Sequence, residues 1–272
     1  MHASTVQRCV VALLGLAVST VCGHAQTVIV NVDLAPGGSG GGTAVTFAAQ
    51  GALASPGNVW NAVSPSSDGT ANGEFGSGGR LDFGGDPFSA GSLLNSTGGV
   101  TTISVEVFKG DPDGGFALNP LNGWETRLAD NARDLMRDFL VSGYDTNPNA
   151  VNITGLSTGS SYVLYLYGAG DHGGVSTKFT IDGVDKFTTG VPETSHNLTE
   201  GEDYVVFSGI ASNGTIAITY MNNGESGDGN FNGFQLSYTP PVAIPTLSGW
   251  GMILLAILIA WIAWRRFQPA VA

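Results

Sequence analysis

Short runs in which apolar and polar residues alternate recur along the middle of the chain, and they constrain its fold more than any other feature. Alternation with period two is the pattern of a β-strand with one buried face. It occurs in the runs Thr102–Val107, Thr215–Tyr220 and Gly233–Tyr238. The run Tyr162–Tyr167 is apolar on both faces, which is typical of a central strand, and Val28–Leu34 predicts a first strand. These runs together predict an all-β domain.

Two dipeptides predict β-hairpins. Asp182-Gly183 separates the runs Lys178–Ile181 and Val184–Thr188, and Asn213-Gly214 comes directly before Thr215–Tyr220. Asp-Gly and Asn-Gly are favoured in two-residue hairpin turns because both central residues need positive φ. Loops are expected where glycine, serine and asparagine gather, at residues 36–43, 64–80 and 84–99.

One segment has helical periodicity instead. From Glu125 to Leu140, apolar residues recur at intervals of three and four, with charged residues between them. This pattern predicts a short amphipathic helix whose apolar side packs over one end of the β-domain. A helix that binds a partner's groove is the alternative interpretation.

Residues 1–25 have the pattern of a secretory signal peptide. A basic residue precedes an apolar stretch, and Gly23-His24-Ala25 supplies small residues ahead of the cut. We predict cleavage between Ala25 and Gln26. A lipoprotein signal built on Cys22 is the alternative, although Val21 stands where such signals carry a small side chain.

Cysteine usage and charge limit what the exported part can do. Cys9 and Cys22 are the only cysteines, so the chain after Ala25 has no thiol for a disulfide, a nucleophile or a thiolate metal site. The chain carries 22 acidic and 10 basic residues, a formal net charge of −12. This charge opposes binding to nucleic acid and to anionic lipid surfaces, and it suits solubility or cation binding.

The C-terminal segment is apolar and ends in basic residues. Residues 239–243 form a Pro-rich linker, and the run Met252–Trp264 is uncharged. Crossing a hydrocarbon core of roughly 30 Å takes about 20 apolar residues, so a single transmembrane helix at residues 252–264 would be slightly short. Arg265 and Arg266 would be the membrane stop, with residues 265–272 as a cytoplasmic tail. A buried core helix is the alternative.

The segment that follows this linker resembles a known sorting signal. Ile244-Pro245-Thr246-Leu247 and Trp250-Gly251, followed by the apolar run and paired arginines, resemble the IPTL-CTERM tail, a relative of PEP-CTERM tails. The resemblance implies that residues 244–251 are recognised by an exosortase-type membrane protease or transpeptidase. It implies export across the inner membrane, anchoring by the C-terminal helix, and display at the cell surface or secretion after processing. Gly249 departs from the family, which often has an acidic residue there.

The middle of the chain resembles the galactose-binding-like jelly-roll domains that often precede such tails. The resemblance rests on four stretches: Asn58–Asn61, Ser161–Asp171, Tyr204–Phe207 and Phe231–Leu236. It implies a jelly-roll or β-sandwich domain at residues 26–238. The whole expected architecture is therefore an all-β sandwich with one short amphipathic helix, an N-terminal signal peptide and a single C-terminal transmembrane helix.

One acidic segment has the start of a calcium-binding loop. From Glu225 to Gly233, oxygen-bearing side chains stand at alternate positions, but position twelve would be Thr239 instead of a bidentate glutamate, which excludes an EF-hand. A looser structural calcium site on Glu225, Asp228 and Asn230 is one interpretation, since galactose-binding-like sandwiches often hold such an ion. A solvated turn is the other. No other cofactor is expected.

No motif in the sequence predicts a reaction. Gly37–Gly41 and Gly155–Gly159 match the nucleophile-elbow string, and Gly168–Gly173 matches a dinucleotide-binding string, but none precedes a predicted helix. His172 and His196 stand in polar loops, and a general base or metal ligand at His172 is the less favoured reading. A carboxylate pair for glycoside cleavage could come from Asp111, Asp113 and Asp171.

We therefore expect an exported, non-enzymatic cell-surface or extracellular-matrix protein that is sorted through its tail. Binding of an extracellular polysaccharide is one role that such a domain could serve. Two alternatives stay open: an extracellular polysaccharide hydrolase or lyase, and a permanently anchored single-pass membrane protein.

Overall fold

The chain divides into two compact units, one formed by Gln26–Pro240 and one by Met1–Ala25 together with Pro241–Ala272. The computed structural model describes residues 26–34, 44–46, 51–63, 80–81, 88–108, 115–118, 135–136, 138–142, 148–169, 175–190, 197–223, 229–241 and 249–266. The predicted signal peptide at residues 1–25 lies outside these residues, so it stays a prediction.

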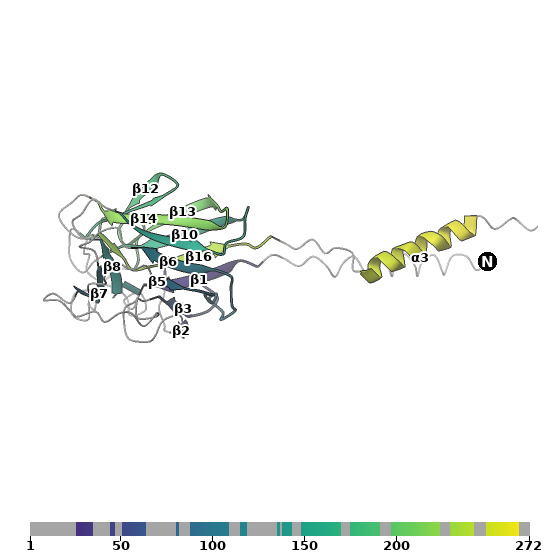
Figure 1. The fold of residues 1–272 in the computed structure, drawn as a ribbon, viewed down its shortest axis with the longest axis horizontal. Helices are drawn as coiled ribbons and strands as arrows, with labels where there is room; N and C mark the ends of the chain where they lie inside the picture. The colour runs from purple at the N-terminus through teal and green to yellow at the C-terminus, as the bar shows by residue number, and fades with distance from the viewer. Residues whose placement is uncertain are drawn as a thin grey trace, which may run out of the picture. The chain divides into compact units, whose positions relative to one another are not determined.

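Two six-stranded sheets form the body of the Gln26–Pro240 unit (Figure 1). The strands of the first sheet lie in the order β13 (Tyr204–Ala211), β10 (Ser161–Tyr167), β16 (Gly233–Tyr238), β1 (Val28–Asp33), β3 (Val59–Ala62) and β2 (Ala44–Thr46). The strands of the second sheet lie in the order β12 (Val184–Phe187), β11 (Thr177–Ile181), β14 (Thr215–Asn222), β9 (Asn149–Thr154), β6 (Ser104–Phe108) and β5 (Phe88–Ala90). Neighbouring strands are antiparallel, except that β1 and β3 run parallel in the described residues.

A smaller sheet of four strands completes the unit. Its order is β15 (Gly229–Phe231), β8 (Asp138–Ser142), β7 (Gly115–Leu118) and β4 (Arg80–Leu81). Through Leu140 on β8 and Phe231 on β15, this third sheet adds side chains to the main hydrophobic core.

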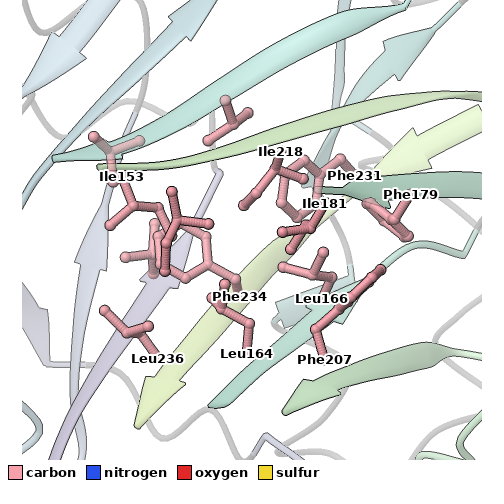
Figure 2. Close-up of a cluster of buried hydrophobic side chains, with 14 of the residues drawn as sticks. Ile153, Leu164, Leu166, Phe179, Ile181, Phe207, Ile218, Phe231, Phe234 and Leu236 are labelled. Carbon is pink, nitrogen blue, oxygen red and sulfur yellow. The ribbon is translucent and has the colours of Figure 1, made fainter. Parts of the chain in front are cut away.

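The main core lies between the two large sheets, which establishes the predicted β-sandwich. Alternate residues of the inner strands point inward, as period two requires, and they form one buried cluster: Val30, Val32, Leu164, Leu166, Phe234 and Leu236 from the first sheet, with Val151, Ile153, Phe179, Ile181, Ile216 and Ile218 from the second. Figure 2 shows part of this cluster. The Phe231 ring packs edge-on against Phe179 and Tyr220, with ring centroids 5.0 and 5.2 Å apart. Burial of each such side chain stabilises the fold by about 1.5–3 kcal/mol.

Consecutive strands cross from one large sheet to the other. β9 is in the second sheet, β10 in the first, β11 and β12 in the second, β13 in the first, β14 in the second and β16 in the first. As a result, the order β1-β16-β10-β13 in one sheet accompanies the order β9-β14-β11-β12 in the other.

Most of the alternating runs form the strands that the sequence predicts. The first strand, the central strand and the three alternating runs correspond to β1, β10, β6, β14 and β16. β10 is central, since β13 and β16 pair with its two edges. The Asp182-Gly183 hairpin is also confirmed: Ile181 pairs with Val184, and the turn residues have φ of 50° and 76°.

The second predicted hairpin is wrong. Asn213-Gly214 joins β13 to β14, but β13 pairs with β10 in the first sheet, whereas β14 pairs with β9 and β11 in the second. The turn therefore carries the chain across the sandwich. Both strands still bury alternate side chains in the same core. The alternation of apolar and polar residues on either side of the turn is therefore the same as in a hairpin.

The predicted helix at Glu125–Leu140 is confirmed only at Leu135 and Met136, which are helical, whereas Asp138–Leu140 belong to β8 (Asp138–Ser142), which lies between β7 and β15. Residues 125–134 and 137 lie outside the described residues. Pairing on both edges satisfies the backbone of β8, and this outweighs the local helical pattern. In the stretches expected to be loops, Phe88–Ala90 forms β5 and Arg80 begins β4.

Candidate functional site

The predicted sorting segment ends in a helix, α3 (Gly249–Arg266). Trp250 and Gly251 lie in its first turn, and Arg265 and Arg266 are its last two residues, where cations favour the carboxyl end of the helix dipole. Ile244, Pro245, Thr246 and Leu247 lie outside the described residues.

The surface of α3 is apolar along its length. Its exposed apolar side chains, which are 44–69% accessible, are Ile253, Leu254, Leu255, Ile257, Ile259, Trp261, Ile262 and Trp264. Among the described residues, no helix is both long enough and apolar enough to span a membrane, so the structure does not support the predicted membrane span at residues 252–264. The 18 residues of α3 rise about 27 Å and include both arginines.

The predicted calcium ligands are only partly described. Glu225 and Asp228 lie outside the described residues, whereas Asn230 lies on β15 and is 2% exposed. Its backbone N–H donates to Thr177 Oγ1 over 2.8 Å, and its Nδ2 is 3.4 Å from the oxygen of Ala169. Its Oδ1 has no hydrogen-bond partner within the described part of the chain. That part also contains no group of three acidic, histidine or cysteine side chains placed to hold a metal. The calcium site stays a prediction.

The other residues singled out for chemistry are not brought together. Asp111, Asp113, Asp171, His172 and His196 lie outside the described residues. The Gly155–Gly159 string forms a turn between β9 and β10, so Ser157 has no helix behind it. The next strand after Gly168 is β11, which is also the wrong context for a dinucleotide-binding turn.

A group of tyrosines lies on the outer face of the first sheet, on the side away from the main core. This tyrosine cluster consists of Tyr165 and Tyr167 on β10 and Tyr204 on β13. The Tyr204 ring centroid is 6.0 Å from that of Tyr165 and 5.7 Å from that of Tyr167. Tyr167 is fully buried, whereas Tyr165 and Tyr204 are half-buried and Leu198 packs beside them.

A buried hydrogen-bond network holds Tyr167 in place. Its hydroxyl donates to Gln235 Oε1 over 2.5 Å and accepts from the backbone N–H of Ala52 over 2.7 Å. Gln235 Nε2 donates to Asn31 Oδ1 and to the Leu53 oxygen, and its Oε1 accepts from the Leu53 N–H, each over 2.9 Å. This Gln235 network fastens the segment at Ala52 and Leu53 to the outer face of the sheet. Burial raises the pKa of Tyr167 far above its ordinary value.

The open side of the tyrosine cluster carries negative charge. Burial raises the pKa of Tyr204, and the nearby charge of Glu200 adds to the effect, so this hydroxyl stays protonated at neutral pH. Glu200 itself is exposed. Two half-buried tyrosine rings next to a carboxylate can pack against an apolar ring face and accept hydrogen bonds from hydroxyl groups. Strand periodicity alone places Tyr165 opposite the core, but it does not show that Tyr204 lies beside it.

Comparisons with known proteins support the predicted IPTL-CTERM segment and say little about the Gln26–Pro240 unit. Residues 242–268 match the model of the IPTL-CTERM motif, a span that includes Ile244–Leu247, Trp250 and Gly251. A comparison with curated proteins finds no match. Among solved structures, a similar chain is the isomalto-dextranase of Arthrobacter globiformis T6 in complex with panose, at 15% identity and a TM-score of 0.25. The similarity covers 56% of this chain and 23% of the enzyme, and at this TM-score it carries no argument about fold or activity.

Proposed function

We propose that this chain is an exported, non-enzymatic cell-surface or extracellular-matrix protein that is sorted through its C-terminal segment. The match of residues 242–268 to the IPTL-CTERM motif is the observation that carries the proposal. A C-terminal sorting signal of this kind implies export and association with the cell surface. The compact unit that precedes it, Gln26–Pro240, is the part that reaches that surface.

The proposed partner in sorting is an exosortase-type processing enzyme. It would recognise Ile244–Leu247 with Trp250 and Gly251, and Arg265-Arg266 would mark the cytoplasmic end of the signal. The Pro-rich residues 239–243 would keep the recognised segment clear of the folded domain, because proline-rich linkers are stiff and extended.

Mass spectrometry of the C-terminus tests this proposal. In a host that has an exosortase, the full chain at the cell surface is expected to lack Ala272, whereas a P245A/T246A variant is expected to keep Ala272 and to lose at least 90% of its surface form. Ser248→Ala is the matched control, since Ser248 lies in the same segment but outside the six motif residues. Surface protein with an intact Ala272, or normal processing of P245A/T246A, would contradict the proposal.

For the exported domain, we propose a jelly roll of the galactose-binding-like kind that binds a neutral carbohydrate at the tyrosine cluster. The strand orders β1-β16-β10-β13 and β9-β14-β11-β12 support the jelly roll, since two intertwined Greek keys produce this alternation between sheets. The half-buried rings of Tyr165 and Tyr204 support the sugar site. The net charge of −12 favours a neutral polymer over an anionic one.

Binding to neutral polysaccharides by the full chain tests the carbohydrate role. Tyr204→Ala is expected to weaken binding by about 2- to 13-fold, because a lost aromatic contact removes about 0.5–1.5 kcal/mol. Tyr238→Ala is the matched control: Tyr238 is also a partly buried tyrosine, but it stacks on Tyr162 and lies outside the tyrosine cluster. Equal loss in both variants, or no binding by the unaltered chain, would remove the sugar role and leave the sorting proposal standing.

A further inference from the structure

The edge strand β13 has the kind of sequence that readily pairs with a strand of another protein chain. It lies at the end of the first sheet and reads Tyr-Val-Val-Phe-Ser-Gly-Ile-Ala, eight residues with neither a charge nor a proline. Only one side of β13 pairs with a strand in the described residues, and that strand is β10. An uncharged edge of this length is a template for pairing with another strand unless something covers it.

Two outward carbonyl groups of β13 are covered by atoms from outside the first sheet. The Tyr204 oxygen accepts the N–H of Gly201 over 2.8 Å. The Val206 oxygen accepts a hydrogen bond from Nζ of Lys186, and this Nζ lies 5.3 Å from the centroid of the Phe207 ring. Lys186 belongs to β12, the edge strand of the second sheet. One ammonium group therefore reaches from one sheet across the open edge of the other.

Among the described residues, backbone contacts cover only the start of this edge. The N–H of Thr189 donates to the Gly201 oxygen and the N–H of Gly190 to the Glu202 oxygen, so the chain that leaves β12 runs along the turn ahead of β13. Farther along β13, Ser208 is exposed. Beyond Tyr204, Lys186 is thus the contact that, within the described part of the chain, separates the edge of β13 from an incoming strand.

We propose that β13 is a docking edge for a second copy of this chain and that Lys186 holds it closed. Two copies of β13 aligned antiparallel about Val206 would place Tyr204 opposite Ser208, and no like charges would meet. An incoming strand would have to displace an ammonium group that is held by both a carbonyl and an aromatic face. Removal of this single side chain exposes an uncharged, self-complementary edge.

The oligomeric state of variants of the full chain tests the proposal, with light scattering after size exclusion in a detergent that disperses α3. Lys186→Met is expected to dimerise at a concentration at least 10-fold lower than the unaltered chain. Its backbone amides between Tyr204 and Ser208 are expected to gain protection from hydrogen exchange. Lys186→Arg keeps the charge and the donor, and it is expected to behave like the unaltered chain.

Two further variants distinguish the role of Lys186 at the β13 edge from the effect of losing any positive charge. Lys178→Met is the matched control, because Lys178 is also on the second sheet but contacts Asp185, with Nζ 3.8 Å from Oδ2. It is expected to leave association unchanged. The double variant K186M/S208K restores a charge on the same edge, so it is expected to return the chain to its original state.

Three outcomes would overturn the proposal: a folded K186M that associates no more than the unaltered chain, equal association by K178M, or association with protection gained elsewhere than in β13. If Lys186→Met fails to fold, Lys186→Gln gives the same test, because it removes the charge and keeps a hydrogen-bond donor.

Discussion

Gln235 is a polar residue at the centre of a sheet, and it is fully buried because every one of its side-chain groups finds a partner. It joins Tyr167, Asn31 and Leu53 through hydrogen bonds of 2.5–2.9 Å. Buried polar groups cost stability unless they are paired, so the members of the Gln235 network depend on one another. The network holds a covering segment in register on the sheet, and apolar packing alone would fix that segment less specifically.

Replacement of Gln235 by leucine is expected to lower the free energy of unfolding by about 2–4 kcal/mol. The new side chain leaves the buried Tyr167 hydroxyl and the partly buried Leu53 backbone groups without their partner, which costs more than one ordinary hydrogen bond. Urea denaturation with an unchanged m-value measures the loss. Ser237→Ala, on the same strand, is the control and is expected to change stability by less than about 0.5 kcal/mol. Equal effects in the two variants would show that the network contributes nothing specific.

Stability should also fall at alkaline pH because of Tyr167. Its pKa is raised in the folded protein by burial, whereas a tyrosine in the unfolded chain ionises near pH 10. A raised folded pKa means that the stabilisation is complete below about pH 10 and is lost as the pH rises above it. Tyr167→Phe is expected to make this decline shallower by up to about 1.4 kcal/mol per pH unit, although it lowers stability at pH 7. An unchanged slope in urea denaturation between about pH 10 and pH 12 would contradict this.

At the residue scale, the sequence predicts which side chains enter the core and misses the buried polar ones. Ile216 and Ile218 follow from alternation, because a strand buries every second residue. Gln235 also sits in an alternating run, where the pattern predicts a solvent-facing residue. Its burial comes from Ala52 and Leu53, which are more than a hundred residues away along the chain, and no local pattern reports such a contact.

At the scale of structural elements, turn glycines allow a direct test of the fold. A glycine can be required because its backbone has a positive φ, or because a neighbouring atom leaves no room for a Cβ atom. Gly155 follows β9 with φ of 72°, and a Cβ there would lie 1.9 Å from the oxygen of Thr102. Gly183 in the β11–β12 hairpin has φ of 76°, yet a Cβ there would meet nothing within 4 Å. The two positions share a left-handed backbone and differ in the space around it.

Gly183→Ala is therefore expected to cost about 1 kcal/mol, the strain of an alanine in the left-handed region. Gly155→Ala is expected to cost at least about 2 kcal/mol more, because the backbone around Thr102 must also move. Thermal and urea denaturation of the two variants measure the difference. Similar losses would mean that the contact with Thr102 relaxes at no cost.

The elements that the sequence predicts incorrectly share one physical cause. Asn213-Gly214 has the chemistry of a hairpin turn, but whether the next strand returns to the same sheet depends on the partners of β13 and β14. Likewise, Asp138–Ser142 has helical spacing on its N-terminal side and becomes β8 because β7 and β15 pair with both of its edges. Strand pairing depends on residues that are distant in the sequence. A short pattern therefore predicts that a strand forms better than it predicts which strand it pairs with.

At the scale of the whole molecule, the chain consists of a folded unit with its own core and a tail unit that carries α3. The core residues all belong to Gln26–Pro240, and in the described residues none comes from α3. The tail could be read from a contiguous motif, which is why the sequence alone predicts the sorting segment. The tyrosine cluster needed the structure, because it joins two strands that are about forty residues apart.

The folded unit should be independent of the tail. A chain of residues 26–240 is expected to give the same near-ultraviolet circular dichroism as the full chain in detergent, with a melting temperature within about 2 °C. The reason is that every strand of both large sheets lies inside this range. A much lower melting temperature for the shorter chain would show that the tail contributes to the core.

The pairing of β16 with β1 and β10 also determines how strongly the domain resists a pulling force. Val28 lies opposite Tyr238, and Gly233 lies opposite Asp33, so β1 begins and β16 ends at the same end of the paired strands. A pull on the C-terminus that is resisted at the opposite end of these strands loads all hydrogen bonds of β16 at once, in shear. A pull between the two termini would peel β16 from β1 one bond at a time. The same sheet is therefore expected to resist a load between the C-terminus and the opposite end of these strands better than a load between the two termini.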